Sequence, residues 1–186
     1  DTAQMRDFAN HFLASFGLLE EAGRAAPLQR APNDTVRVTF VMRKNYMAHP
    51  RTSRSADRQI SNEEEAVSAV ASVEGTRVQA VSFEHISTLQ EQMAIIAHTD
   101  LLIGVHGAGL TFSLFLPPEA AVLELVPPGG AKNVHFNYTT AWAGLYYRTF
   151  PIGHASPKHH VDPSRLREVV EQVLQERRRH WGSQVG

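Results

Sequence analysis

Residues 100–127 read DLLIGVHGAGLTFSLFLPPEAAVLELVP, and this stretch decides the fold. It predicts a buried strand at 101–105, a His-Gly-Ala-Gly turn, a short helix at 108–115 and a second buried strand at 121–125. Uninterrupted aliphatic runs of this length are typical of strands that are covered on both faces, as in parallel sheets. Gly107 and Gly109 permit a tight turn that a ligand can approach closely. The backbone N–H groups that open the following helix favour an anion at this turn.

Composition limits the possible classes of protein. With 186 residues, of which 42% are hydrophobic, the chain is long enough to bury the core of one domain. Its 18 basic and 19 acidic residues give no general electrostatic argument for nucleic acid as a partner. No apolar run approaches the roughly 20 residues that span a bilayer, so we expect no membrane contact within this segment. The absence of cysteine excludes disulfides and a thiol nucleophile, and the histidines lack paired metal-ligand spacing.

Helical and extended patterns alternate along the rest of the chain. The predicted strands are 36–42, 76–83 and 145–150, and the predicted helices lie within 5–16, after capping boxes at Ser61 and Thr88, and from Pro163 onward. Residues 24–35 read as a linker and 43–57 as a polar loop, and the pattern between 127 and 142 is open. Strands separated by helices predict a Rossmann-like α/β fold with three layers and a mainly parallel sheet. We expect a helix and linker at 1–35, the Rossmann-like domain at 36–160, and an amphipathic helix at 161–186 that packs on the same domain.

Three features are expected at the carboxyl edge of this sheet, where such folds bind ligands. They are the loop with Arg43, Arg51, Arg54 and Arg58, the turn at His106, and Glu124 in the next strand. Each has an alternative interpretation: the cations can be a solvated surface, His106 a hydrogen-bonded turn residue, and Glu124 an edge or surface group. The glycine spacing fits neither the dinucleotide fingerprint nor a Walker loop, and Ser113 lacks the setting of a hydrolase nucleophile. Together the three features predict a phosphate site.

Six segments in a fixed order resemble the C-terminal half of glycosyltransferase family 61, over residues 36–150. They are Arg43-Lys44-Asn45-Tyr46, residues 58–63, Glu91-Gln92, residues 100–111, residues 114–117, and Glu124-Leu125. The resemblance implies one lobe of a two-lobed, B-type, inverting glycosyltransferase. Its donor would be a nucleotide sugar, usually a uridine diphosphate sugar, bound mainly against this lobe.

The resemblance also implies roles for individual residues. Arg43 and Arg58 would hold the diphosphate, since the guanidinium fork suits phosphate. Glu124 would bind ribose or sugar hydroxyls, and backbone N–H groups of the turn would face the phosphates; the turn residues are His106, Gly107, Ala108, Gly109 and Leu110. No Asp-x-Asp occurs, which agrees with metal-independent chemistry without a cofactor. The gap between Arg43 and Arg58 is longer than the usual family spacing, so Arg51 and Arg54 stay alternatives.

An inverting transfer needs a base near the acceptor hydroxyl. The chain offers no convincing candidate, and we expect the base and the acceptor site in an N-terminal lobe that this chain lacks. The acceptor would be a protein or a glycan. Two alternatives remain: a non-catalytic domain of this type that serves as a structural subunit, and another phosphate-binding α/β domain.

The resemblance places the protein in the lumen of the secretory pathway, in the endoplasmic reticulum or Golgi. Two glycosylation sequons, Asn33-Asp34-Thr35 and Asn137-Tyr138-Thr139, favour this location weakly.

Overall fold

A computed structural model describes residues 2–23, 35–43, 47–49, 52–55, 59–129 and 134–182. Its centre is a sheet of five parallel strands in the order β4-β1-β5-β6-β7. Their bounds are β1 Val36–Val41, β4 Thr76–Val81, β5 Leu101–Val105, β6 Ala121–Val126 and β7 Tyr146–Pro151. The predicted strands are therefore present, and the predicted parallel sheet is confirmed.

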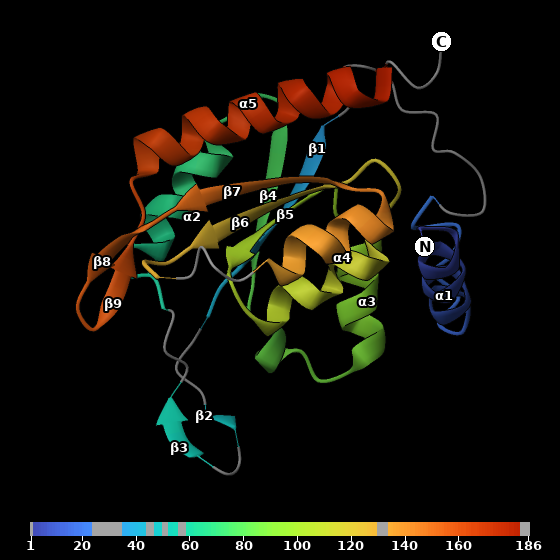
Figure 1. Ribbon diagram of the computed structural model, residues 1–186, viewed down its shortest axis with the longest axis horizontal. Helices are drawn as coiled ribbons and strands as arrows, with labels where there is room; N and C mark the ends of the chain where they lie inside the picture. The colour runs from blue at the N-terminus through green and yellow to red at the C-terminus, as the bar shows by residue number, and fades with distance from the viewer. Residues whose placement is uncertain are drawn as a thin grey trace.

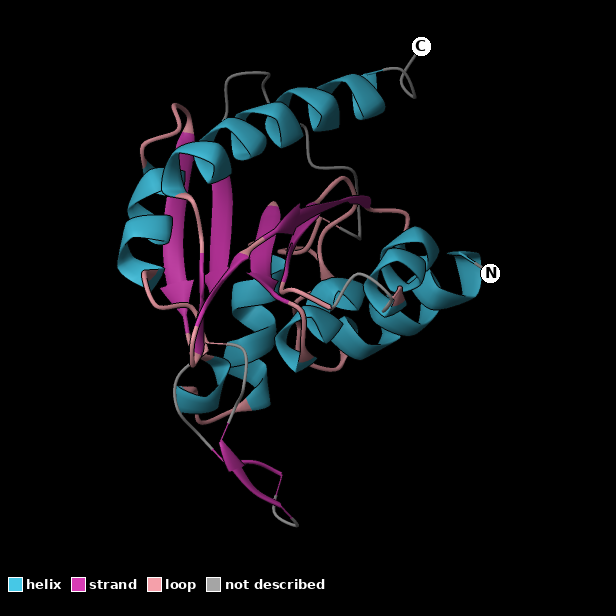
Figure 2. Ribbon diagram, turned by 60° about the vertical axis from the view of Figure 1, so that its left-hand side comes forward, coloured by secondary structure: helices cyan, strands magenta, loops and turns pink. Residues whose placement is uncertain are grey.

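Helices cover both faces of this sheet (Figures 1 and 2). On one face lie α2 (Glu63–Ala71) and α5 (Pro163–Gly182), whose apolar residues share a core with Val38 and Leu123. On the other face lie α1 (Thr2–Ala14), α3 (Leu89–Ala97), the 3-10 helix η2 (Ala108–Phe115) and α4 (His135–Ala143), packed around Leu102 and Val122. The three-layer α/β fold predicted from the sequence is confirmed.

The buried strands explain why the aliphatic run at 100–127 organises the chain. All five residues of β5 are buried, because β5 lies in the middle of the sheet with helices on both sides. Its odd-numbered residues, such as Ile103, enter the core under α2 and α5, whereas Leu102 enters the core under α3 and α4. A strand that faces two cores has no solvent side, so its sequence shows no polar alternation.

Two of the three predicted helix starts are confirmed. The Thr88 hydroxyl oxygen accepts the Glu91 N–H at 3.2 Å, and the Glu91 carboxylate accepts the Thr88 N–H, which completes a capping box. Asp162 accepts the Arg165 N–H at 3.1 Å and so caps α5. The capping box predicted at Ser61 is wrong: Asn62 holds the cap position, and the Ser61 hydroxyl donates to the His159 carbonyl at 3.0 Å.

The loops contain more structure than the sequence predicted. The predicted polar loop 43–57 contains a two-stranded hairpin, β2 (Met47–His49) with β3 (Thr52–Ser55). A second hairpin, β8 (Gly153–Ala155) with β9 (Lys158–His160), follows β7, and a short 3-10 helix η1 (Phe83–His85) follows β4. Strands of three or four residues are too short to give a clear periodic pattern in the sequence.

Candidate functional site

The sheet order places the ends of β1 and β5 side by side. The chain leaves β1 towards β4 on one side, and the later strands β5, β6 and β7 extend to the other side. The point between β1 and β5 is therefore the topological switch point, where open α/β sheets bind ligands beyond the carboxyl ends of their strands. Arg43 follows β1, and the turn beginning at His106 follows β5.

Arg43 lies directly against the glycine turn. Its Nη1 atom donates to the His106 carbonyl at 3.4 Å, and its backbone N–H donates to the Glu63 carboxylate at 3.0 Å. A Cβ atom added to Gly107 would lie 2.7 Å from Arg43 Nη1, which is closer than real Cβ contacts. Glycine at 107 is therefore what permits the guanidinium to lie on the backbone of the turn.

Gly109 permits a second close contact, between the turn and the end of β1. A Cβ atom on this residue would lie 2.9 Å from Cγ1 of Val41, the last residue of β1. The two glycines thus bring the turn against the end of β1 and against the arginine that follows it.

The turn presents backbone donors at the same place. The Leu110 N–H donates to the Gly107 carbonyl at 3.0 Å, and the His106 N–H donates to the Leu125 carbonyl at 3.0 Å. Within the described part of the chain, the N–H of Gly107 donates to no backbone carbonyl, and Ala108 and Gly109 open η2 directly after it. A guanidinium beside such N–H groups is an arrangement that binds phosphate or another oxyanion.

Behind the turn, Glu124 of β6 is buried and holds two neighbours. Its side chain is 1% exposed; one oxygen accepts from His106 Nδ1 and the other from the hydroxyl of Tyr147 in β7. Burial, together with the hydrogen bond and the negative charge of Glu124, raises the pKa of Tyr147 well above its usual value. The His106 ring also meets the Phe136 ring of α4, with centroids 5.1 Å apart.

A pocket of about 310 Å³ opens at this edge of the sheet, next to Arg43 and Gly109. Phe83 and Phe112 line it and contact each other, with ring centroids 4.6 Å apart. Glu84 and Gln92 supply polar groups to the same pocket. An apolar wall with a few polar groups is typical of sites for small ligands and cofactors.

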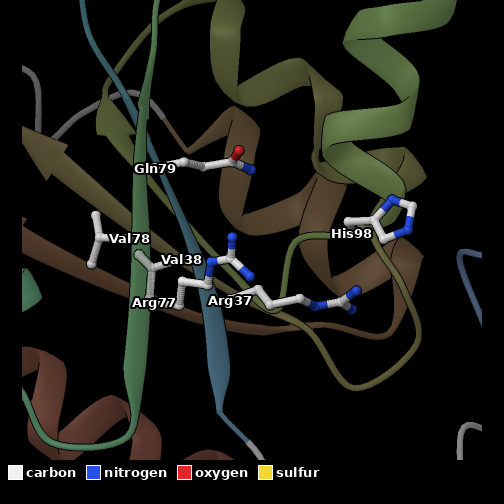
Figure 3. Close-up of a pocket in the computed structure, with 6 residues that line it drawn as sticks. All are labelled: Arg37, Val38, Arg77, Val78, Gln79 and His98. Atoms are coloured by element: carbon white, nitrogen blue, oxygen red, sulfur yellow. The ribbon is translucent and has the colours of Figure 1, made fainter.

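A second pocket of about 340 Å³ lies at the amino end of β1 and β4 (Figure 3). Arg37 and Arg77 line it as partners in register on adjacent strands, and His98 lies beyond the end of α3. Arg37 is engaged by Asp100, whose 1% exposed carboxylate accepts from its Nε at 3.0 Å and its Nη2 at 3.1 Å. This pocket is at the opposite end of the strands from the glycine turn, so the two are separate.

The structure brings most of the predicted site residues together. Arg43, the turn 106–110 and Glu124 all lie at the carboxyl edge of the sheet. Arg51 and Arg58 lie outside the described residues, and Arg54 lies in β3. The contact of one of these three arginines with phosphate stays a prediction.

Sequence reasoning missed Tyr147 and the pair Phe83 and Phe112. Tyr147 lies in a predicted strand, but only the register of β6 with β7 reveals that it shares a face with Glu124. The aromatic pair joins η1 to η2, and nothing in the sequence relates these two segments.

Two features are absent from the described residues. No group of three or more histidine, aspartate or glutamate side chains in that part of the chain is arranged to hold a metal ion. None of the helices described there is long and apolar enough to cross a membrane.

Comparison with known proteins identifies related sequences. The family described as Glycosyltransferase 61 matches residues 3–123. Beta-1,2-xylosyltransferase RCN11 of Oryza sativa subsp. japonica is 32% identical over 156 residues, which cover 81% of this chain and 28% of that protein. A beta-1,2-xylosyltransferase of Arabidopsis thaliana is 25% identical over 186 residues, covering 92% of this chain and 34% of that protein. An EGF domain-specific O-linked N-acetylglucosamine transferase of Drosophila melanogaster is 38% identical over 96 residues, covering 52% and 16%.

The chain thus spans about a third or less of the length of these relatives. Among solved structures, a flavo di-iron protein mutant from Thermotoga maritima is similar, with a TM-score of 0.50 and 14% identity over 78% of this chain and 37% of that chain. At this identity the likeness concerns the fold alone.

Proposed function

Because the chain belongs to glycosyltransferase family 61, we propose that it forms the donor-binding lobe of an inverting enzyme that uses a nucleotide sugar, with a uridine diphosphate sugar as donor. The observation that carries this proposal is Arg43 lying on the glycine turn, beside the backbone N–H of Gly107 and the N-terminal end of η2. These groups converge at the switch point of the sheet, where they would meet a diphosphate.

The same groups suit the chemistry of the leaving group. In an inverting transfer, the bond from the sugar to the diphosphate breaks while the acceptor oxygen forms its bond to the opposite face of the same carbon. The diphosphate leaves with the electron pair, and the acceptor proton passes to a base. Donors already aimed at the diphosphate stabilise its growing negative charge and so lower the barrier. Arg43 and the backbone N–H groups of residues 107–109 would supply this stabilisation without a metal ion.

The nucleoside would extend from the turn into the pocket lined by Phe83 and Phe112. Its volume of about 310 Å³ is in the range of pockets that hold small ligands. The predicted contact between Glu124 and ribose or sugar hydroxyls stays a prediction, as does the predicted contact between Arg58 and phosphate. We place the catalytic base and the site for a protein or glycan acceptor in a second lobe.

Calorimetric titration of the chain tests this proposal. The titrants are uridine diphosphate, uridine diphosphate xylose, uridine diphosphate N-acetylglucosamine and a nicotinamide dinucleotide. We expect binding of the uridine diphosphate ligands, unchanged affinity after addition of a metal chelator, and a loss of about ten- to hundredfold in Arg43→Ala, since a hydrogen bond to a charged group contributes roughly 1.5–3 kcal/mol.

Arg77→Ala is the matched control for the Arg43 variant. It removes the same charge from an exposed arginine at the opposite end of the sheet, so it should bind like the unmodified chain. Binding of the dinucleotide alone would favour another phosphate-binding domain. Silence towards every titrant, both in this chain and in the full-length protein, would support the structural-subunit alternative.

For localisation we propose the lumen of the secretory pathway. Of the two sequons, Asn33 lies outside the described residues, whereas Asn137 is exposed on α4, where an oligosaccharyltransferase can reach it. The protein purified from a secretory host should carry a glycan that a glycosidase removes and that Asn137→Gln abolishes. An unmodified Asn137 in such a host would remove the support that this sequon gives.

A further inference from the structure

Three side chains form a hydrogen-bonded row behind the glycine turn, across three adjacent strands of the sheet. They are His106, which follows β5, Glu124 of β6 and Tyr147 of β7. Glu124 is 1% exposed as a residue and His106 is 4% exposed. A carboxylate this deep in a protein is costly unless donors satisfy both of its oxygens. Here each oxygen has one donor.

The chemistry of a carboxylate determines where the protons lie. An ionised carboxylate only accepts hydrogen bonds, so Nδ1 of His106 and the phenol of Tyr147 both carry protons. With Nδ1 protonated, the Nε2 atom of a neutral His106 ring is an acceptor. The raised pKa of Tyr147 keeps its phenol a donor at any physiological pH.

The position of His106 matters because its carbonyl receives the Arg43 guanidinium and the next residue is Gly107. The ring also contacts the Phe136 ring edge to face. Fixing the ring therefore fixes the peptide whose carbonyl accepts from Arg43 and from which the turn continues.

We propose that Tyr147 is a positioning residue of the donor site: through Glu124 it fixes the ring and tautomer of His106, and thereby the turn that receives the diphosphate. This inference rests on the proposed function. In this role Glu124 links Tyr147 to His106 behind the turn. Tyr147 acts through Glu124, to which its hydroxyl donates.

The strand that carries Tyr147 provides its own control. Tyr146 is the preceding residue, points to the opposite face of β7, and donates its hydroxyl to Glu176 of α5. Tyr147→Phe and Tyr146→Phe each delete one phenolic oxygen that donates to a glutamate. Only the first deletion concerns Glu124.

The test combines ¹⁵N spectra of the histidine rings with titration of uridine diphosphate. In the unmodified chain we expect the His106 ring nitrogens to report a protonated Nδ1 that is hydrogen-bonded to Glu124. In Tyr147→Phe, Glu124 keeps one donor of two, so its negative charge is less compensated. The ¹⁵N signals of the His106 ring should then shift, and uridine diphosphate should bind on the order of tenfold more weakly. Tyr146→Phe should change neither quantity.

Each outcome decides the inference separately from the proposed function. If the unmodified chain binds uridine diphosphate and Tyr147→Phe changes neither the His106 signals nor the affinity, the inference is wrong and the proposed function stands. If the unmodified chain binds no nucleoside diphosphate, the proposed function fails, and with it the role in donor binding. A His106 ring that is protonated only on Nε2 in the unmodified chain overturns the inference without any variant.

Discussion

Gly107→Ala should separate the binding of the diphosphate from the stability of the fold. The added Cβ would lie 2.7 Å from Nη1, 3.1 Å from Cζ and 3.3 Å from Nη2 of Arg43. These atoms are the far end of a flexible side chain, so the guanidinium moves away and the core stays intact. The variant therefore displaces the arginine that we assign to the phosphates without deleting its charge.

The magnitude follows from the contact that is lost. A charge-assisted hydrogen bond contributes roughly 1.5–3 kcal/mol, and each 1.4 kcal/mol or so changes an equilibrium constant tenfold. We expect uridine diphosphate to bind about ten- to hundredfold more weakly. Gly107 has φ +157°, where alanine is strained, so a cost of about 1–3 kcal/mol in the free energy of unfolding accompanies this loss.

Gly75→Ala is the control for backbone strain. Gly75 has φ +76°, and a Cβ there meets nothing within 4 Å. It should lower the free energy of unfolding by a similar amount and leave the affinity unchanged. Urea denaturation and calorimetric titration measure the two quantities. Unaltered affinity in Gly107→Ala, or an equal loss of affinity in both variants, would refute the assignment of Arg43 and the turn.

Three further predictions concern stability. Gly109→Ala places a Cβ 2.9 Å from Cγ1 of the buried Val41, so overpacking should cost about 1–3 kcal/mol in urea denaturation, and an unchanged midpoint would contradict the tight contact. Asp100→Asn removes the carboxylate that Arg37 engages at the amino end of the sheet. We expect the free energy of unfolding to fall by about 2–3 kcal/mol and the affinity for uridine diphosphate to stay unchanged. Weakened binding would be evidence against two separate pockets. Thr88→Ala removes the cap of α3 and should cost about 1 kcal/mol, whereas Thr88→Ser should restore most of it; equal stability of the two variants would argue against the capping box.

The fold was predictable because its inner strands β5 and β6 are covered on both faces. Residues 101–105 and 121–125 are apolar except for Glu124, and both segments are buried within the sheet. The two hairpins, the 3-10 character of 108–115 and the cap at Asn62 were not predictable. The hairpin strands are too short to give a clear periodic pattern. The cap at Asn62 goes with a contact to a distant segment, since the Ser61 hydroxyl donates to the His159 carbonyl instead of capping its own helix.

The sequence predicted which residues belong to the candidate site, but it did not predict how they contact one another. The order of Arg43, the glycine turn and Glu124 in the chain indicated one sheet edge, because parallel strands end at the same edge. The partner of Glu124 did not follow from the sequence. Its neighbours are set by the register of β5, β6 and β7, which places Tyr147 on the same face as Glu124.

The sequence by itself determined that residues 100–127 form two covered strands around an anion-binding turn, since aliphatic runs and glycines restrict the backbone locally. Only the tertiary structure decided which close contacts the two glycines permit. The contacts of Gly107 with Arg43 and of Gly109 with Val41 join segments more than sixty residues apart, and these contacts exist because β1 and β5 are neighbours. The burial of Glu124 between His106 and Tyr147 has the same origin, since each of the three comes from a different strand.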